Sequence, residues 1–241
     1  MSDEEVKPPI PEENWGYDLY PERRGGRYKA PVSKILLGEG RENIDRLKCE
    51  SRVWSCIQKS PLVKLMMSAL KSSGCEIDIS RHISCETCAP SVSGGYDPER
   101  NQVVVCQNMA TSEGIVQSVL THEFIHMFDY CNNHLDFKNL EHLACTEVRA
   151  ANLTHCSFIS AMFQGDASPI KIAKAHQDCV KTRAAHSIVA VRQISEEEAR
   201  KIVDKVFDKC YGDLEPIGRR IRRNSLDMQK AYMERFVYGY D

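Results

Sequence analysis

The chain has 241 residues, 42% hydrophobic and 27% charged, which is enough for one substantial domain or two small lobes. Its formal net charge of −2 gives no indication of nucleic-acid binding. No stretch approaches the roughly 20 apolar residues that cross a bilayer, and the acidic N-terminus resembles neither a transit peptide nor a secretory signal, so we expect a soluble or peripheral protein.

The first 40 residues differ in composition from the rest of the chain. Residues 1–40 are rich in proline, glycine and charge, so we expect a flexible tail with at most one short helix. Residues 41–241 are predicted to form a single domain. Apolar residues between Asn43 and Lys71 have the spacing of one or two amphipathic helices, broken near Ser60-Pro61.

A β-like region follows these helices. Cys75–Ile79 alternates with period two and predicts a strand, and Gln102–Cys106 is a β-branched run that predicts another. Between them, Gly94–Asn101 is dense in turn-forming residues, and we expect a turn there.

The second half of the chain has mainly helical patterns. Ser112 and Glu113 have the residue types of a cap and a first turn, opening a helix to about Tyr130. The expected class is α+β, a small sheet packed on a mainly helical body with an active-site helix. The run Arg219–Arg223 is expected to be a solvated basic helix face, with a patch for anionic lipid or an acidic partner as the alternative. Further helices are predicted at Leu140–Leu153, 169–185 and 195–210.

The chain contains eleven cysteines, spread along almost its whole length. That distribution favours a disulfide network over a structural zinc site, and the odd number leaves at least one thiol free or paired between molecules. Cys85 and Cys88 are expected to pair with each other, with a metal half-site or a redox pair as alternatives. Because no secretory signal is present, the network points to an oxidising compartment reached without a cleaved signal.

The segment His122-Glu123-Phe124-Ile125-His126 is an HExxH motif in an apolar helix. Histidines four residues apart lie about 40° apart around a helix, so both imidazoles can bind one zinc ion. A catalytic zinc also holds a water molecule and lowers its pKa. Glu123 is placed to act as general base on that water and later as general acid towards the leaving amine. The sequence therefore predicts a zinc-dependent endopeptidase with one Zn²⁺.

Two carboxylates compete for the place of third protein ligand. Glu147 lies on the apolar stripe of its predicted helix, where an unpaired carboxylate is costly, and it is our preferred ligand. A salt bridge to a nearby Arg or Lys is the alternative explanation. Asp129 is on the same helical face as both histidines, and we expect it to orient an imidazole rather than bind the metal.

Other parts of the site stay open at this stage. His142, His155 and Tyr130 are candidates for stabilising an oxyanion, and none of them is assigned. The strand Gln102–Cys106 is the candidate edge along which a substrate strand would pair, unless it is an interior strand.

With these motifs in place, the chain resembles the mitochondrial inner-membrane-associated HExxH protease family. The resemblance implies that His122 and His126 are zinc ligands and that Glu123 is the catalytic acid and base. The predicted domain of residues 41–241 is therefore expected to be a zinc metalloprotease domain. The resemblance further implies a zincin-like protease in the intermembrane space, peripheral to the inner membrane. The implied roles are processing of a mitochondrially encoded ATP synthase subunit precursor and assembly of the ATP synthase membrane sector. The resemblance covers Cys49 to the C-terminus and rests on Gly94–Asp97, Asn101–Asn108, Thr121–Asp129 and Ala144–Leu153.

A second hypothesis comes from a different functional class. The chain could serve as a non-catalytic assembly chaperone or binding module whose metal site is dispensable for its main role. Replacement of Glu123 by Gln discriminates between the two hypotheses, because it removes the chemistry and leaves the binding surface.

Overall fold

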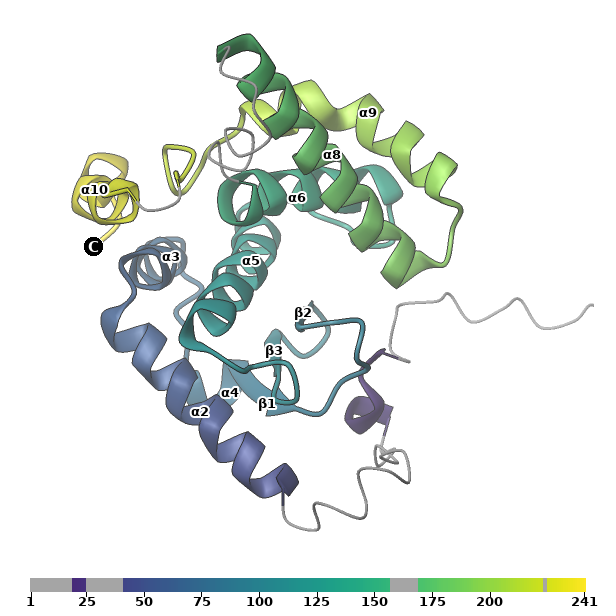
Figure 1. Cartoon of the computed structure of the whole chain (residues 1–241). Coiled ribbons are helices and arrows are strands. Elements are labelled where there is room, and N and C mark those ends of the chain that lie inside the picture. Colours follow the sequence, from purple (N-terminus) through teal and green to yellow (C-terminus); the bar gives the residue numbers. More distant parts are fainter. Residues whose placement is uncertain (1–18, 25–40, 157–168, 223–224) are drawn as a thin grey trace, which may run out of the picture.

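The computed structural model describes residues 19–24, 41–156, 169–222 and 225–241 (Figure 1). Within these ranges helices predominate and one three-stranded sheet is present, which confirms the α+β class. None of the helices in the described ranges is both long enough and apolar enough to span a bilayer. The elements are η2 (Pro21–Arg24), α2 (Arg41–Lys59), α3 (Pro61–Ser72), α4 (Ile79–His82), β1 (Ile83–Glu86), β2 (Gly94–Asp97), β3 (Gln102–Cys106), α5 (Glu113–Asn132), α6 (Leu140–Ala150), η3 (Ala151–His155), α8 (Pro169–Arg192), α9 (Glu196–Gly212), α10 (Asp227–Glu234) and η4 (Arg235–Tyr238).

Serine caps begin several of the predicted helices. The Ser60 side chain accepts a hydrogen bond from the Val63 N–H, which confirms the break between α2 and α3. Ser112 accepts from Ile115 at the start of α5, and Ser195 accepts from Glu198 at the start of α9. The helix predicted at 169–185 continues to Arg192.

The sheet has the strand order β1-β3-β2. β1 is parallel to β3, and β2 is antiparallel to β3. The predicted strand Gln102–Cys106 is confirmed as β3, but it is the central strand. The prediction that it is the substrate edge was therefore wrong. Of the two outer strands, β2 is the one that packs against α5.

The prediction of a strand at Cys75–Ile79 was wrong. The Asp78 carboxylate accepts from the Ser80 N–H and caps the short helix α4, which begins at Ile79. Cys75 is instead held by a disulfide to Cys131 at the end of α5. The period-two pattern thus came from a capped loop, and the strand β1 follows α4.

The turn predicted at Gly94–Asn101 was wrong for its first half, because Gly94–Asp97 forms β2. A Cβ atom at Gly94 would lie 2.3 Å from Cγ1 of Val119 and 2.8 Å from the Val104 carbonyl oxygen. Glycine is therefore required here by the close approach of α5 to the sheet, as occurs at glycines within strands.

Two apolar cores meet at α5 and α6. The first lies among α2, α3, α5, α10 and the sheet, and it includes the fully buried Leu65, Leu120 and Phe124. The second lies among α6, α8 and α9, which pack side by side (Figure 1), and it includes Val180 and Ile188. Because α5 contacts both α6 and η3, residues on this face of α5 lie at the boundary between the cores.

Arg219–Arg222 is not helical, so the prediction of a basic helix face was wrong. Arg222 Nε lies 2.8 Å from Asp227 Oδ2, and Arg219 pairs with Glu234. These ion pairs fold the segment back towards α10.

Five disulfides confirm the predicted network, and the buried Cys56 is the free thiol. The expected pairing of Cys85 with Cys88 was wrong, because their side chains face different elements. In the chain-entropy model, each bond stabilises the folded state by about 3–4 kcal/mol, because it restricts the unfolded chain to a closed loop. The bonds are Cys49–Cys85, Cys75–Cys131, Cys88–Cys106, Cys145–Cys210 and Cys156–Cys179.

Candidate active site

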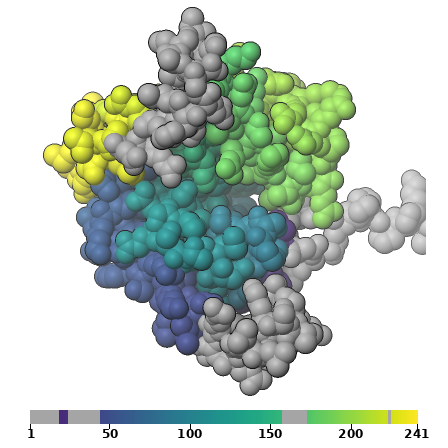
Figure 2. Space-filling model, in the orientation of Figure 1, coloured from purple at the N-terminus to yellow at the C-terminus, as the bar shows by residue number. Residues whose placement is uncertain are grey.

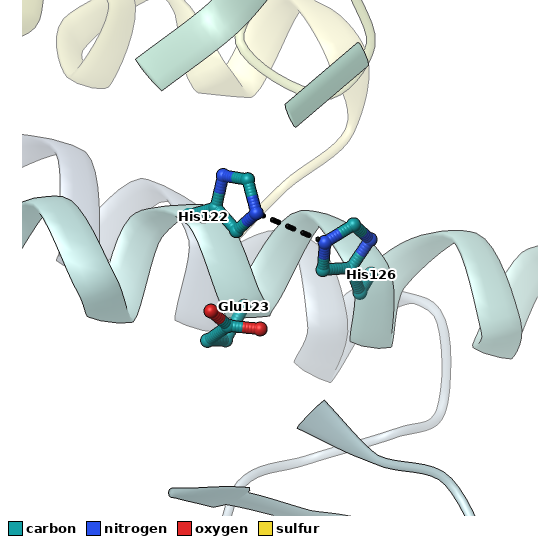
Figure 3. Close-up of side chains that lie close together, drawn as sticks. All are labelled: His122, Glu123 and His126. Carbon is teal, nitrogen blue, oxygen red and sulfur yellow. Dashed lines mark hydrogen bonds between the residues drawn. The ribbon is translucent and has the colours of Figure 1, made fainter. Parts of the chain in front are cut away.

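The HExxH residues lie on the part of α5 that faces the boundary between the cores. The imidazoles of His122 and His126 project together, and their Nε2 atoms lie 3.1 Å apart (Figure 3). Glu123 leaves the helix on the other side (Figure 3). One ligand atom from each of the three residues lies within 4.8 Å of the others. Such a group is capable of holding a metal ion.

Glu147 reaches the same point from α6. Its Oε2 lies 3.6 Å from Nε2 of His122, and its Oε1 lies 3.6 Å from Nε2 of His126. The Glu147 side chain is 8% exposed, and Ser187 of α8 also hydrogen-bonds to it. Among the described residues, no Arg or Lys forms an ion pair with it. Two sets of three metal ligands are therefore possible. Both contain His122 and His126, and the third ligand is either Glu123 or Glu147.

Asp129 does not touch either imidazole directly. Thr146 donates its hydroxyl hydrogen to Asp129 Oδ2 at 2.6 Å, and Arg149 forms a buried ion pair with the same carboxylate. The Thr146 oxygen lies 2.9 Å from Nδ1 of His126. Because its hydrogen is already donated, Thr146 accepts from the Nδ1–H. His126 is thereby held in the tautomer whose Nε2 has a free lone pair.

Burial sets the protonation of the site residues. It lowers the pKa of His126 to about 4, so this imidazole stays neutral at pH 7. It raises the pKa of Glu123 to about 7. Burial also acts to raise the pKa of Glu147, but the two histidines outweigh it and the pKa lies below its usual value. Glu147 therefore loses its proton at a lower pH than Glu123 does.

A cleft extends from these side chains along β2. Its walls include Gly94–Asp97 of β2, Tyr20 beside η2, and Ser187 and Val191 of α8. In the space-filling view this face is hollowed where the teal region meets the green atoms of α8 and α9 (Figure 2). Tyr20 lines this cleft together with Glu123 and Glu147. Burial and the charges of these two carboxylates raise the pKa of its phenol above the usual value.

The HExxH residues and Glu147 fall within the range of one family model. The family model described as "Peptidase M76 family" matches residues 47–218. The chain belongs to the peptidase M76 family. The chain is 47% identical over 174 residues to a human protein named "Mitochondrial inner membrane protease ATP23 homolog", covering 71% of this chain and 70% of that protein. The resemblance seen in the sequence is confirmed.

Two further relatives extend the comparison across this peptidase family. A Danio rerio protein with the same name is 44% identical over 210 residues, covering 86% of this chain and 79% of that protein. A Saccharomyces cerevisiae protein named "Mitochondrial inner membrane protease ATP23" is 38% identical over 178 residues, covering 70% of this chain and 77% of that protein. No solved structure matches the chain.

The three open candidates for oxyanion stabilisation differ in their position relative to the candidate site. The His155 ring centroid lies 4.7 Å from that of His122. Tyr130 packs against Tyr96 and Phe137 at the end of the cleft. His142 is turned away, and its Nδ1 accepts from the Asp136 N–H.

Sequence reasoning did not identify Thr146 or Tyr20 as members of this peptidase site. The position of Thr146 next to Glu147 on a buried helix was an available signal. Tyr20 lies outside the range of the family model and in a segment without periodicity, so no comparable signal existed.

Proposed function

We propose that this M76 peptidase is a zinc-dependent endopeptidase with a zincin-like arrangement, in which His122, His126 and Glu147 hold one Zn²⁺. The observation that carries the proposal is the convergence of two Nε2 atoms, 3.1 Å apart, on a carboxylate 3.6 Å from each. Ligands at 2.0–2.1 Å from a tetrahedral zinc ion lie about 3.3 Å from one another. The three side chains are therefore spaced as zinc ligands require.

The geometry supports different proposed roles for the two carboxylates. Glu147 faces both imidazoles, whereas Glu123 accepts a hydrogen bond from the backbone N–H of Tyr96 on β2. A bound zinc ion supplies a Lewis acid that lowers the pKa of water and polarises a carbonyl. Glu123 accepts the proton of the attacking water and passes it to the nitrogen of the leaving group. Its bond to Tyr96 keeps it beside the edge of the sheet.

The substrate is proposed to bind as an added strand on the outer edge of β2. Cys106 donates its N–H to the Ser93 oxygen, so in this antiparallel pair Ser93 and Gly95 bond to β3. The backbone groups of Gly94 and Tyr96 consequently point away from β3. An extended peptide added along this edge at Tyr96 lies directly beside Glu123.

Removal of the metal tests this function. Purified protein is expected to contain one zinc ion per chain and to cleave members of a peptide library. Treatment with a chelator such as 1,10-phenanthroline should abolish cleavage, and added Zn²⁺ should restore it, because the zinc supplies several kcal/mol of transition-state stabilisation. Zinc is measured by elemental mass spectrometry and cleavage by product mass spectrometry. Cleavage that persists in fully demetallated protein would disprove the metallopeptidase proposal.

Thr146→Val is expected to weaken zinc binding by about 10–100-fold, as loss of a ligand-orienting hydrogen bond does. Valine keeps the shape of the side chain and removes the acceptor that fixes the His126 tautomer. The affinity is measured by competition with a zinc-binding dye. Thr154→Val is the matched control, because Thr154 only donates to the Ala150 carbonyl oxygen. Equal affinities in the two variants would contradict this role of Thr146.

We further propose that the protein resides in the intermembrane space, peripheral to the inner membrane, where it processes an ATP synthase subunit precursor. The names of the relatives support a location at the mitochondrial inner membrane, and the five disulfides support an oxidising compartment. The ATP synthase substrate rests on the family resemblance alone. Exposed apolar side chains on and beside α10 and η4 are proposed to contact the membrane, namely Leu226, Met233, Phe236 and Val237.

Fractionation of mitochondria tests this location. The protein should resist added protease until the outer membrane is ruptured, and alkaline carbonate should then release it. Protection that persists after rupture would place it in the matrix instead. The alternative function, a non-catalytic assembly factor, predicts that assembly of ATP synthase survives the loss of Glu123.

A further inference from the structure

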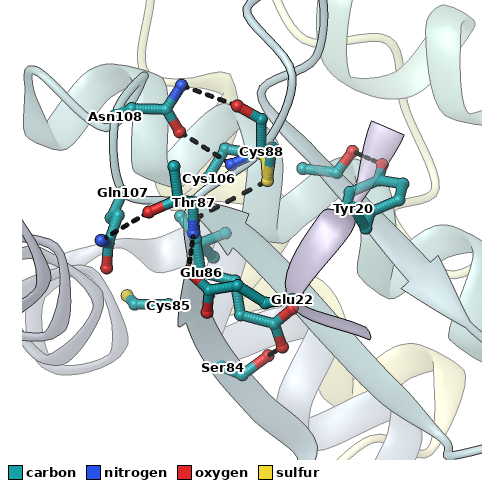
Figure 4. The surroundings of a disulfide bond; sticks show 12 residues. Tyr20, Glu22, Ser84, Cys85, Glu86, Thr87, Cys88, Cys106, Gln107 and Asn108 are labelled. Carbon is teal, nitrogen blue, oxygen red and sulfur yellow. Dashed lines mark hydrogen bonds between the residues drawn. A yellow bond between two sulfur atoms is a disulfide. The ribbon is translucent and has the colours of Figure 1, made fainter. Parts of the chain in front are cut away.

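A short N-terminal segment, residues 19–24, lies on the sheet beside the active site, outside the range that the family model matches. Figure 4 shows Tyr20 and Glu22 of this segment next to the Cys88–Cys106 disulfide. The Ala89 N–H donates to the Leu19 oxygen at 2.9 Å. The Thr87 N–H donates to Glu22 Oε1 at 3.1 Å. The segment is therefore attached to the loop that follows β1.

Arg23 anchors the segment more strongly than these bonds. Its side chain is 3% exposed and lies 2.6 Å from Asp97 Oδ2 and 2.9 Å from Glu86 Oε1. It also donates to Ser84 and Gln102 at 3.1 Å each. A buried guanidinium with two carboxylate partners is costly to disrupt, because loss of one member leaves uncompensated buried charge. The anchor thus fixes the position of the neighbouring Tyr20.

Tyr20 covers the edge of β2 next to the catalytic residues. Its hydroxyl donates to the Gly94 oxygen at 2.5 Å. A Cβ atom at Gly95 would lie 2.2 Å from that hydroxyl, so the phenol occupies the space beside Gly95. The Gly94 carbonyl points away from β3, which makes it an acceptor for any strand added to this edge. Tyr20 therefore takes a place that an extended substrate would otherwise enter.

We propose that Tyr20 is a specificity-determining residue of the peptidase, an inference that rests on the proposed function. Its ring makes the subsite opposite Gly95 shallow, and its hydroxyl ends strand pairing at Gly94. The carbonyl of Tyr96, two residues further along β2, also points away from β3 and can accept a hydrogen bond from a substrate strand beside Glu123. The substrate residue opposite Gly95 must then have a small side chain, while the next residue lies at the catalytic centre.

A peptide library with one varied position tests the proposal. Wild-type protein should favour Gly, Ala or Ser at one position within two residues of the cleaved bond. Tyr20→Ala should raise the ratio of kcat/KM for a Phe peptide over an Ala peptide at that position by about 10-fold or more, the scale of side-chain discrimination in a pocket. Tyr20→Phe keeps the ring and should keep the wild-type ratio. Tyr238→Ala, a tyrosine on η4, is the matched control and should also keep it.

Arg23→Ala provides a second route to the same result. It leaves Tyr20 intact but removes the anchor, so it should relax the preference as Tyr20→Ala does. Affinities of the Phe and Ala peptides for the Glu123→Gln protein, with and without Tyr20→Ala, are measured by fluorescence anisotropy and should shift in the same direction. Wild-type preference retained in both Tyr20→Ala and Arg23→Ala proteins that still cleave would overturn the inference alone. A wild-type protein that neither cleaves nor binds any peptide would overturn the proposed function, and the inference with it.

Discussion

Glu123→Gln is expected to lower kcat/KM for peptide cleavage by about 10²–10⁴-fold, the usual contribution of a general acid–base. Glutamine has the size of glutamate and its carbonyl oxygen can still accept from the Tyr96 N–H. It cannot take a proton from water at neutral pH. Because His122, His126 and Glu147 are unchanged, the zinc content of the variant should remain at one ion per chain. Cleavage and zinc content are measured on the same preparation.

Glu113→Gln is the matched control for this experiment. Glu113 lies in the first turn of the same helix, is exposed and accepts from the Ser55 hydroxyl at 2.8 Å. The same chemical change at that position should leave kcat/KM within a factor of about two, since exposed substitutions rarely exceed ±0.5 kcal/mol in effect. A Glu123→Gln protein that cleaves like this control would exclude Glu123 from the chemistry.

The same variant separates the two functional hypotheses. If cells carrying only Glu123→Gln protein assemble ATP synthase normally, the assembly role is independent of cleavage. If assembly fails together with cleavage, the peptidase activity is the essential one. The two outcomes are distinguishable because Glu123 lines the cleft, whereas the exposed apolar residues of α10 and η4 are not among the described residues that line it.

The helical part of the site could be predicted from sequence because its signals are local. His122 and His126 are one turn apart, and Glu147 lies on the buried face of a periodic helix. Serine caps fixed the starts of α3, α5 and α9 within a residue. In each case the determinant lies within a few residues of the feature that it specifies.

The sheet edge and the N-terminal wall of the cleft could not be predicted in this way. Whether β3 is central depends on its pairing with β1 and β2, which no local pattern records. Gly94 resembled a turn residue, although it is needed for contact with Val119 on α5. The placement of Tyr20 depends on Arg23, whose ionic partners are 63 and 74 residues away in the chain. Long-range contacts of this kind leave no periodic pattern in the sequence.

For the disulfides, the sequence predicted that one thiol stays unpaired, but not which cysteines bond to each other. Eleven cysteines implied a network with one unpaired thiol, and Cys56 is that thiol. The close spacing of Cys85 and Cys88 suggested that they pair, yet Cys85 bonds to α2 and Cys88 to β3. Each partner is fixed by the element that the side chain faces, which depends on the assembled sheet.

Glu147→Ala is expected to reduce bound zinc from one ion per chain to a small fraction at equal free zinc, because it removes one of the three proposed protein ligands. Glu147 is the one carboxylate that lies 3.6 Å from the Nε2 atoms of both imidazoles in the described part of the chain. Asp129→Asn should have a smaller effect, about 10–100-fold in affinity, because Asp129 acts through Thr146 on His126. Zinc is measured by elemental mass spectrometry after dialysis against a zinc buffer.

Glu141→Ala serves as the control, since Glu141 lies on the exposed side of the same helix and pairs with Lys205. It should retain one zinc ion per chain. The decisive result is which of the two variants, Glu147→Ala or Asp129→Asn, loses more zinc, because both substitutions alter buried carboxylates. If Asp129→Asn removed the zinc and Glu147→Ala kept it, Asp129 would be the ligand. That result would require the Asp129 carboxylate to leave both Arg149 and Thr146, which hold it on separate sides in the present fold. Unchanged zinc affinity in Glu147→Ala would by itself disprove the ligand assignment.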